Sequence, residues 1–401
     1  MKIIDSKSHF HNEQVDILIE NHTIKSIAAK INSRADHVIE SEFLHVSQGW
    51  IDIGAMCWDP GHEYREDKQS LKAAAAHGGF TTVYIWPNTD PTIDNKAQYQ
   101  YYSHYNEGGG IKVLPICSLT KKSKGTELAE LIDLNHSGAT LFSDGLVFNG
   151  SIKELNKALE YTKSINAYVL YAPSPFDINP DGQIHESSTS IALGLQGLAG
   201  ASERISVQKA IALAEYAETN FVLHNISTKA SLQASKSKSV SALGVAYLNL
   251  CKTVNSCEGF NTNYKVIPPL RNTPDSKALI KGVINNQITY ICSNHYPLEN
   301  DVKDMEFGMA RFGASGIETL FSGLIMDTNL EVETIVDKLT YGPASAAGIK
   351  LPPIKEKEKA NLTLFDPTIS WVYDRSTCKS KSMNNPYFGK QLKGKVLAVM
   401  C

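Results

Sequence analysis

The chain has 401 residues, of which 42% are hydrophobic and 20% are charged, a composition typical of a folded protein rather than a disordered one. Its 39 Lys and Arg residues against 42 Asp and Glu residues give a net charge of -3, so no basic field exists to bind nucleic acid or an anionic membrane. No apolar stretch reaches the roughly 18 residues of a membrane-spanning helix, and residues 1–10 lack the apolar run of a signal peptide, so we expect a cytoplasmic protein.

The two ends of the chain share one pattern. Residues 1–48 alternate apolar and polar side chains, most clearly at 15–20, and residues 360–401 do the same. This alternation predicts half-buried antiparallel strands. We therefore expect segments 1–48 and 346–401 to pair into one small β-sandwich domain beside the middle of the chain, residues 49–345.

In the middle segment, short β-rich runs alternate with helix-length segments, which is the pattern of parallel strands joined by crossover helices. Most of the runs are almost continuously apolar, as expected for strands buried on both faces. Eight runs predict an α/β protein with a (β/α)8 TIM barrel. The runs are 49–55, 81–86, 112–118, 139–143, 167–171, 220–226, 264–267 and 288–293.

Residues capable of chemistry stand where these runs end. Asn88 follows the second run, Asp144 follows the fourth, His224 lies in the sixth, and Asn294 and His295 follow the eighth. The carboxyl ends of barrel strands open onto one face, so these side chains are predicted to meet at a single mouth.

Motifs along nearly the whole chain resemble those of the dihydroorotases, a family of the amidohydrolase superfamily. The resemblance implies an amidohydrolase-type barrel that forms or opens a cyclic amide in pyrimidine biosynthesis. It also implies a zinc centre, usually of two metals, that activates water and polarises the carbonyl. The motifs are found at 48–52, 78–83, 87–91, 142–145, 224–228, 265–271, 313–319 and 385–387.

The first-strand motif departs from the family pattern. That pattern, Asp-x-His-x-His-x-Arg-x-Pro-Gly, implies two zinc ligands and an arginine for the substrate carboxylate. Here Gly54 and Met56 stand at the degenerate ligand positions, and Trp58 stands at the arginine's position. Glycine has no ligand atom, a thioether prefers softer metals than zinc, and an indole has a single neutral donor. Both the metal and the substrate are therefore predicted to lose an anchor.

The eighth strand shows a parallel loss. The family pattern Thr-Asp-His-Ala-Pro reads Ser-Asn-His-Tyr-Pro here, so Asn294 replaces the catalytic aspartate, and an amide cannot accept a proton at neutral pH. The fifth strand places Tyr171 where the family has another histidine. Only Asp144 and His224 remain as vestigial metal ligands, fewer than the three of a catalytic zinc. The residues expected to line the substrate pocket are Asn88, Trp58, Tyr171 and His295.

These replacements predict a catalytically inactive dihydroorotase-like protein without a cofactor. The resemblance implies that such a protein acts as a structural or regulatory partner of aspartate transcarbamoylase. The family also commonly pairs its barrels, so we expect a homodimer.

Two alternatives remain open. One is a working dihydroorotase, or an enzyme for another cyclic amide, with a rebuilt mononuclear zinc site gathered from His185, Asp144, His224 and His295. The other is a small-molecule sensor, because an aromatic barrel mouth can stack a planar ligand. The aromatic residues expected at the mouth are Trp58, Trp86, Tyr171 and Tyr296.

Overall fold

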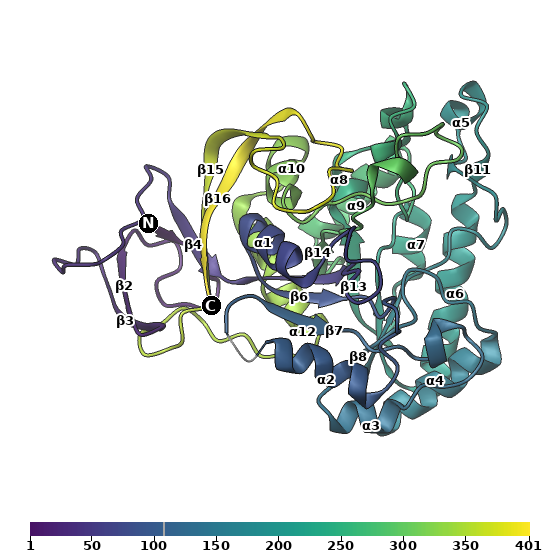
Figure 1. Ribbon diagram of the computed structural model, residues 1–401, viewed down its shortest axis with the longest axis horizontal. Helices are drawn as coiled ribbons and strands as arrows, with labels where there is room; N and C mark the ends of the chain where they lie inside the picture. Colours follow the sequence, from purple (N-terminus) through teal and green to yellow (C-terminus); the bar gives the residue numbers. More distant parts are fainter. Residues whose placement is uncertain (107–108) are drawn as a thin grey trace.

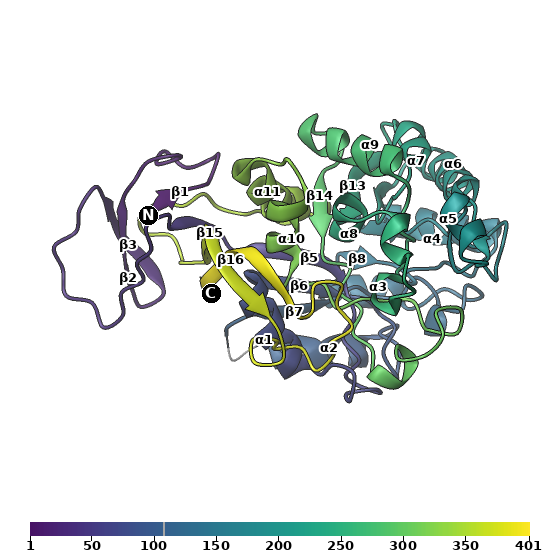
Figure 2. The same ribbon diagram turned by 90° about the horizontal axis from the view of Figure 1, so that it is seen from above.

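The computed structural model describes residues 1–106 and 109–401. It shows a barrel of strands surrounded by helices, with a smaller β-sheet region at one side where both termini lie (Figures 1 and 2). The barrel carries the candidate site, and the terminal sheet is continuous in sequence with its first strand.

Across the described residues, eight parallel strands form the barrel wall, which confirms the predicted α/β barrel. One ladder holds β5–β6–β7 and another holds β8–β9–β12–β13–β14. The ladders meet at a bridge between Cys117 and Phe142, and at a 2.8 Å hydrogen bond from the Met56 amide to the His295 carbonyl. The strands are β5 (Trp50–Ala55), β6 (Phe80–Ile85), β7 (Lys112–Pro115), β8 (Leu141–Phe142), β9 (Tyr168–Tyr171), β12 (Asn220–Leu223), β13 (Val240–Ala246) and β14 (Tyr290–Cys292).

The seventh strand is not where the sequence pattern placed it. The run 264–267 begins at the last residue of a short 3-10 turn, Thr262–Tyr264, and continues as a loop, and β13 takes the seventh position instead. β13 reads Val-Ser-Ala-Leu-Gly-Val-Ala, with too few bulky residues to be recognised as a buried strand. Its Gly244 is required by packing, because a Cβ there would collide with the Tyr290 ring of the neighbouring strand.

Most of the helices pack on the outer face of the barrel, and the helix Tyr341–Ala346 packs against its interior apolar cluster. Several begin at a polar side chain that accepts hydrogen bonds from the first-turn amides, as Asp67, Ser151 and Asn272 do. No helix in the described ranges is long and apolar enough to cross a membrane. The helices are α1 (Lys68–Gly78), α2 (Lys96–Tyr105), α3 (Leu131–His136), α4 (Ile152–Ser164), α5 (Ser188–Ala192), α6 (Gly200–Ala217), α7 (Lys229–Ala234), α8 (Tyr247–Cys251), α9 (Thr273–Ile284), α10 (Leu320–Asp327), α11 (Val332–Leu339) and α12 (Tyr341–Ala346).

One sheet joins strands from both ends of the chain, in the order β1 (Lys2–Ile3), β4 (His45–Gln48), β15 (Leu362–Tyr373) and β16 (Lys390–Met400). β15 runs antiparallel to both β4 and β16. Two shorter pairs lie outside it, β2 (Asp16–Glu20) with β3 (Thr23–Ala28), and β10 (Ile184–His185) with β11 (Gly197–Leu198). The domain boundaries after residues 48 and 345 stay a prediction.

Candidate functional site

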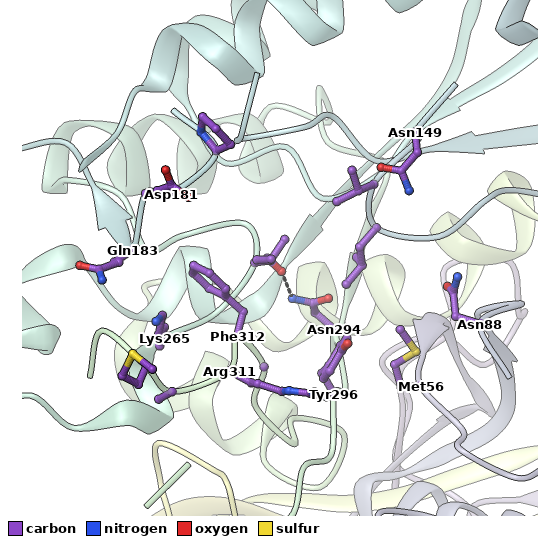
Figure 3. Close-up of a pocket in the computed structure, with 18 of the residues that line it drawn as sticks. Met56, Asn88, Asn149, Asp181, Gln183, Lys265, Asn294, Tyr296, Arg311 and Phe312 are labelled. Atoms are coloured by element: carbon purple, nitrogen blue, oxygen red, sulfur yellow. Dashed lines mark hydrogen bonds between the residues drawn. The ribbon is translucent and has the colours of Figure 1, made fainter. Parts of the chain in front are cut away.

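A cavity of about 800 Å³ opens where the barrel strands end (Figure 3). Its lining comes from the segments that follow β5, β6, β8 and β14, as the barrel geometry requires. The structure therefore brings together six of the residues singled out from the sequence. They are Met56, Trp58, Asn88, Asp144, Asn294 and Tyr296.

Tyr171 does not line this cavity, contrary to expectation. Successive strand residues point to opposite faces, and Leu170 faces the barrel interior with Ile51 and Ile53. Tyr171 consequently lies in the outer hydrophobic layer, where its hydroxyl is 2.9 Å from the Ser206 hydroxyl of α6. It does not occupy a position at which it could face a metal or a substrate.

His224 is completely buried below the cavity. Its Nδ1 lies 2.6 Å from the Tyr290 hydroxyl, and its ring stacks on Tyr290 and meets the Trp86 ring edge-on at 5.2 Å. Burial lowers the pKa of His224 to about 3, so the imidazole is neutral. Its Nε2 faces Gly54, where an added Cβ would come within 2.8 Å of that nitrogen and 2.9 Å of Trp86.

The Asp144 carboxylate is directed at the loop after β7. Its Oδ1 accepts hydrogen bonds from the Ser118 hydroxyl at 2.8 Å and the Thr120 amide at 2.9 Å, and its Oδ2 accepts one from the Thr120 hydroxyl at 2.5 Å. Burial raises the pKa of Asp144 although these bonds oppose the rise.

The sequence resemblance implies zinc as the metal. His224 and Asp144 are the two residues at family ligand positions that could still donate to it. The space beside the His224 nitrogen is filled by the Trp86 indole, and both Asp144 oxygens are already bonded to protein groups. The residues present at these positions do not fit a two-zinc centre.

Asn294 and Trp58 are both bonded to main-chain carbonyls. The Asn294 amide nitrogen donates to the Ile267 carbonyl at 2.7 Å, and its oxygen accepts from the Asn225 amide at 3.1 Å (Figure 3 shows the first bond). The Trp58 indole donates to the Pro297 carbonyl at 2.8 Å. The Trp58 indole has no second polar hydrogen to donate, whereas Asn294 keeps one N–H and one oxygen lone pair beyond these bonds.

His295 and Asn88 have mainly structural partners. The Nδ1 of buried His295 accepts a hydrogen bond from the Gly316 amide at 3.1 Å, and its Nε2 lies 3.4 Å from the buried Glu66 carboxylate, so His295 lies behind the cavity lining. The Asn88 amide nitrogen donates to the Asp144 carbonyl at 3.3 Å. The Asn88 oxygen is buried and makes no hydrogen bond to any described residue.

Asp52 ties β5 to β14 and makes folding pH-dependent. The Ser293 amide donates to one carboxylate oxygen at 2.8 Å and the Ser293 hydroxyl donates to the other, yet burial raises the pKa of Asp52 to about 6. As pH rises from 4 to 6 the unfolded chain loses this proton before the folded one does, so stability falls by on the order of 3 kcal/mol. In urea titrations across this range, the free energy of unfolding of wild type should fall relative to that of Asp52→Asn as pH rises. Parallel pH profiles for the two proteins would contradict the assignment.

Sequence reasoning missed the outer wall of the cavity. Gln183, Lys265, Arg311 and Phe312 line it, together with Asn149. Lys265 begins the 265–271 motif, and Arg311 stands just before the 313–319 motif. Their closeness to these motifs is the sequence signal that could have marked them as cavity residues. Their convergence depends on long loops, which have no periodicity to reveal where they fold.

Comparison with solved structures shows the fold. The L-hydantoinase from Arthrobacter aurescens superposes with a TM-score of 0.83 at 19% identity, covering 99% of this chain and 93% of that protein. A D-hydantoinase gives a TM-score of 0.79 at 19% identity, with 100% and 92% covered. These proteins have the amidohydrolase (β/α)8 fold, which confirms the predicted fold class.

Comparison of sequences identifies closer relatives. The family model described as dihydro-orotase-like matches residues 46–231. The dihydroorotase of Geobacter metallireducens is 33% identical over 396 residues, covering 96% of this chain and 92% of that protein. The dihydroorotase of Pelobacter propionicus is 31% identical, with 97% and 94% covered.

These relatives correct one expectation from the sequence, that the protein needs no cofactor. That expectation is wrong, because dihydroorotases and hydantoinases typically use zinc, so zinc is the cofactor implied for a protein with these relatives. Identity above 30% along almost the full length leaves no ambiguity about descent: the chain belongs to the dihydroorotase family.

Proposed function

We propose that this chain is a dihydroorotase-family protein of pyrimidine biosynthesis that does not catalyse the ring reaction and instead serves as a structural or regulatory partner of aspartate transcarbamoylase. The observation that carries the proposal is the bonding of Asn294 to the Ile267 carbonyl and the Asn225 amide. At the position where the family uses a proton-carrying aspartate, this chain has a group that already serves as structural support.

Loss of substrate anchoring supports the same proposal. Trp58 stands at the position of the family's carboxylate-binding arginine, and its only polar hydrogen is donated to Pro297. Arg65 stacks over the Trp58 ring at 4.7 Å and makes two hydrogen bonds to Glu299, of 2.6 and 2.8 Å. A paired guanidinium is not available to bind a substrate carboxylate.

Retention of the scaffold supports a role in assembly. The eight parallel strands form the barrel wall. The Asn385 side chain of the C-terminal segment donates hydrogen bonds to the Ser315 carbonyl and the Thr319 hydroxyl of the 313–319 motif. The assignment of aspartate transcarbamoylase as partner rests on the resemblance to non-catalytic members of the family.

The test is a steady-state assay with dihydroorotate and with carbamoyl aspartate, in the presence of added zinc and with bound zinc measured in the same sample. We expect no turnover by this chain, whereas the dihydroorotase of Geobacter metallireducens, assayed in parallel, turns over. A kcat of roughly 1 per second or more, which is the ordinary enzyme range, would overturn the proposal.

The partner is tested separately by size-exclusion chromatography with light scattering. Mixing the chain with aspartate transcarbamoylase from the same cell should give a complex larger than either protein alone. Separate elution at micromolar concentrations of both proteins would remove the partner assignment and leave the catalytic prediction intact.

A further inference from the structure

Two buried lysines, Lys265 and Lys303, lie next to each other without an acidic partner among the described residues. Lys265 is 3% exposed and lines the cavity, whereas Lys303 is 5% exposed and is not part of the lining. All the hydrogen bonds of both ammonium groups go to main-chain carbonyls. A buried charge is ordinarily neutralised by a partner of opposite sign, so this arrangement favours the neutral form of an amine.

The Lys265 amine is held in a fixed orientation. Its Nζ donates to the carbonyls of Phe307 at 2.8 Å and Gly308 at 2.9 Å. The Phe312 ring lies 4.9 Å from the same nitrogen, and Figure 3 shows the two side chains together on the cavity wall. A neutral amine has two N–H groups, so both hydrogen bonds persist when the third proton is lost. The lone pair then occupies the remaining tetrahedral position of a nitrogen that lines the cavity.

Lys303 places a second positive charge beside this amine. Its Nζ donates to the carbonyls of Arg311 and Gly313, each at 2.9 Å, and lies 3.5 Å from the Lys265 carbonyl. Burial, with the charge of Lys265 added to it, lowers the pKa of Lys303 to about 7, and burial lowers the pKa of Lys265 to about 8. About half of the Lys265 amines are therefore neutral at pH 8, against roughly one in 250 for an ordinary lysine.

The other titratable residues of the lining do not restore the charge on Lys265. They are Asp144, Asp181, Tyr296 and Arg311, and none of them forms a hydrogen bond or ion pair with the Lys265 ammonium. Both Asp144 oxygens already accept hydrogen bonds from the loop after β7. The cavity wall around Lys265 therefore leaves the neutral, nucleophilic form of its amine accessible to a small molecule.

We propose that Lys265 is a nucleophilic amine that captures small aldehydes or ketones in this cavity as a Schiff base, an activity separate from the proposed function. A lysine that is desolvated beside another cationic group is activated in this way. The nitrogen lone pair attacks the carbonyl carbon and forms a C–N bond. The two amine hydrogens then leave with the carbonyl oxygen as water, and a C=N bond remains. No oxidant or reductant is consumed, and the protonated imine keeps one N–H for the Phe307 or Gly308 carbonyl.

Reductive trapping on the full chain tests this proposal. Benzaldehyde is the probe, cyanoborohydride reduces any imine to a stable secondary amine, and peptide mass spectrometry gives the labelling rate of each lysine. At pH 8 we expect Lys265 to be labelled at least tenfold faster than the exposed Lys236. Lys303 should stay unlabelled, because it does not line the cavity. Equal rates at Lys265 and Lys236, or no label at Lys265, would overturn the proposal.

The pH profile separates an activated amine from one that is merely accessible. The ratio of the Lys265 rate to the Lys236 rate should fall more than about tenfold between pH 8 and pH 10, because an ordinary lysine becomes neutral only in the upper part of this range. A constant ratio would contradict the assignment.

Lys265→Arg supplies the matched variant, since it keeps a cationic donor near the Phe307 and Gly308 carbonyls but has no nucleophilic amine. It should lose the fast label and leave the Lys236 rate unchanged. Fast labelling that persists in Lys265→Arg would assign the nucleophile elsewhere. Turnover of dihydroorotate would overturn the proposed function but would not alter these labelling readouts.

Discussion

Replacing Arg271 with methionine should lower the free energy of unfolding by about 3–5 kcal/mol, the cost of leaving a buried charge without its partner. Arg271 and Glu203 are both about 1–2% exposed and are joined at 3.0 Å. Glu203 also accepts hydrogen bonds from the amides of Ser227 and Thr228, at 2.8 and 2.9 Å. Burial opposes ionisation of Glu203, but Arg271 and these bonds hold the pKa of its carboxyl below the usual value.

This ion pair supports the loop that follows β12 and carries Asn225, the partner of Asn294. Because the pKa of Glu203 is lowered on folding, its stabilising contribution is present above the ordinary glutamate pKa and is lost as pH falls through the folded value. Urea unfolding at pH 7 measures the effect of Arg271→Met.

The control for this prediction is the double variant Glu203→Gln with Arg271→Met, which removes both charges. It should lose less stability than the two single changes added together, because neither charge is then left unpaired. A loss below about 1 kcal/mol for Arg271→Met would contradict the assignment of a buried ion pair.

The sequence predicted the barrel because seven of its eight strands carry bulky apolar runs, and it predicted the two terminal strand segments from their alternation. β13 was missed because it has few bulky residues, and its Gly244 lies against the Tyr290 ring of β14, so the strand has no strong apolar pattern. The candidate site was predicted in part. Residues that directly follow strands, such as Asn88 and Asn294, reach the cavity. Tyr171 lies within a strand, and the sequence does not reveal whether its side chain points into the barrel or toward the surrounding helices.

Gly54→Ala should destabilise the protein by about 2–5 kcal/mol, which combines the cost of a left-handed backbone with that of crowding in a packed interior. Gly54 has φ +88°, and an added Cβ meets both the His224 nitrogen and the Trp86 ring at under 3 Å. The same crowding means that Gly54→His alone should not rebuild a family-like metal site, because the space for a second imidazole is already filled by Trp86.

Gly194→Ala provides the matched control, since Gly194 has φ +65° but no atom within 4 Å of an added Cβ. It should cost only about 1 kcal/mol, the backbone part of the effect. The difference between the free energies of unfolding of the two variants, measured with urea, therefore shows how tightly Trp86 and His224 fill the barrel centre. Equal losses for the two would mean that this centre relaxes readily and would contradict the packing argument.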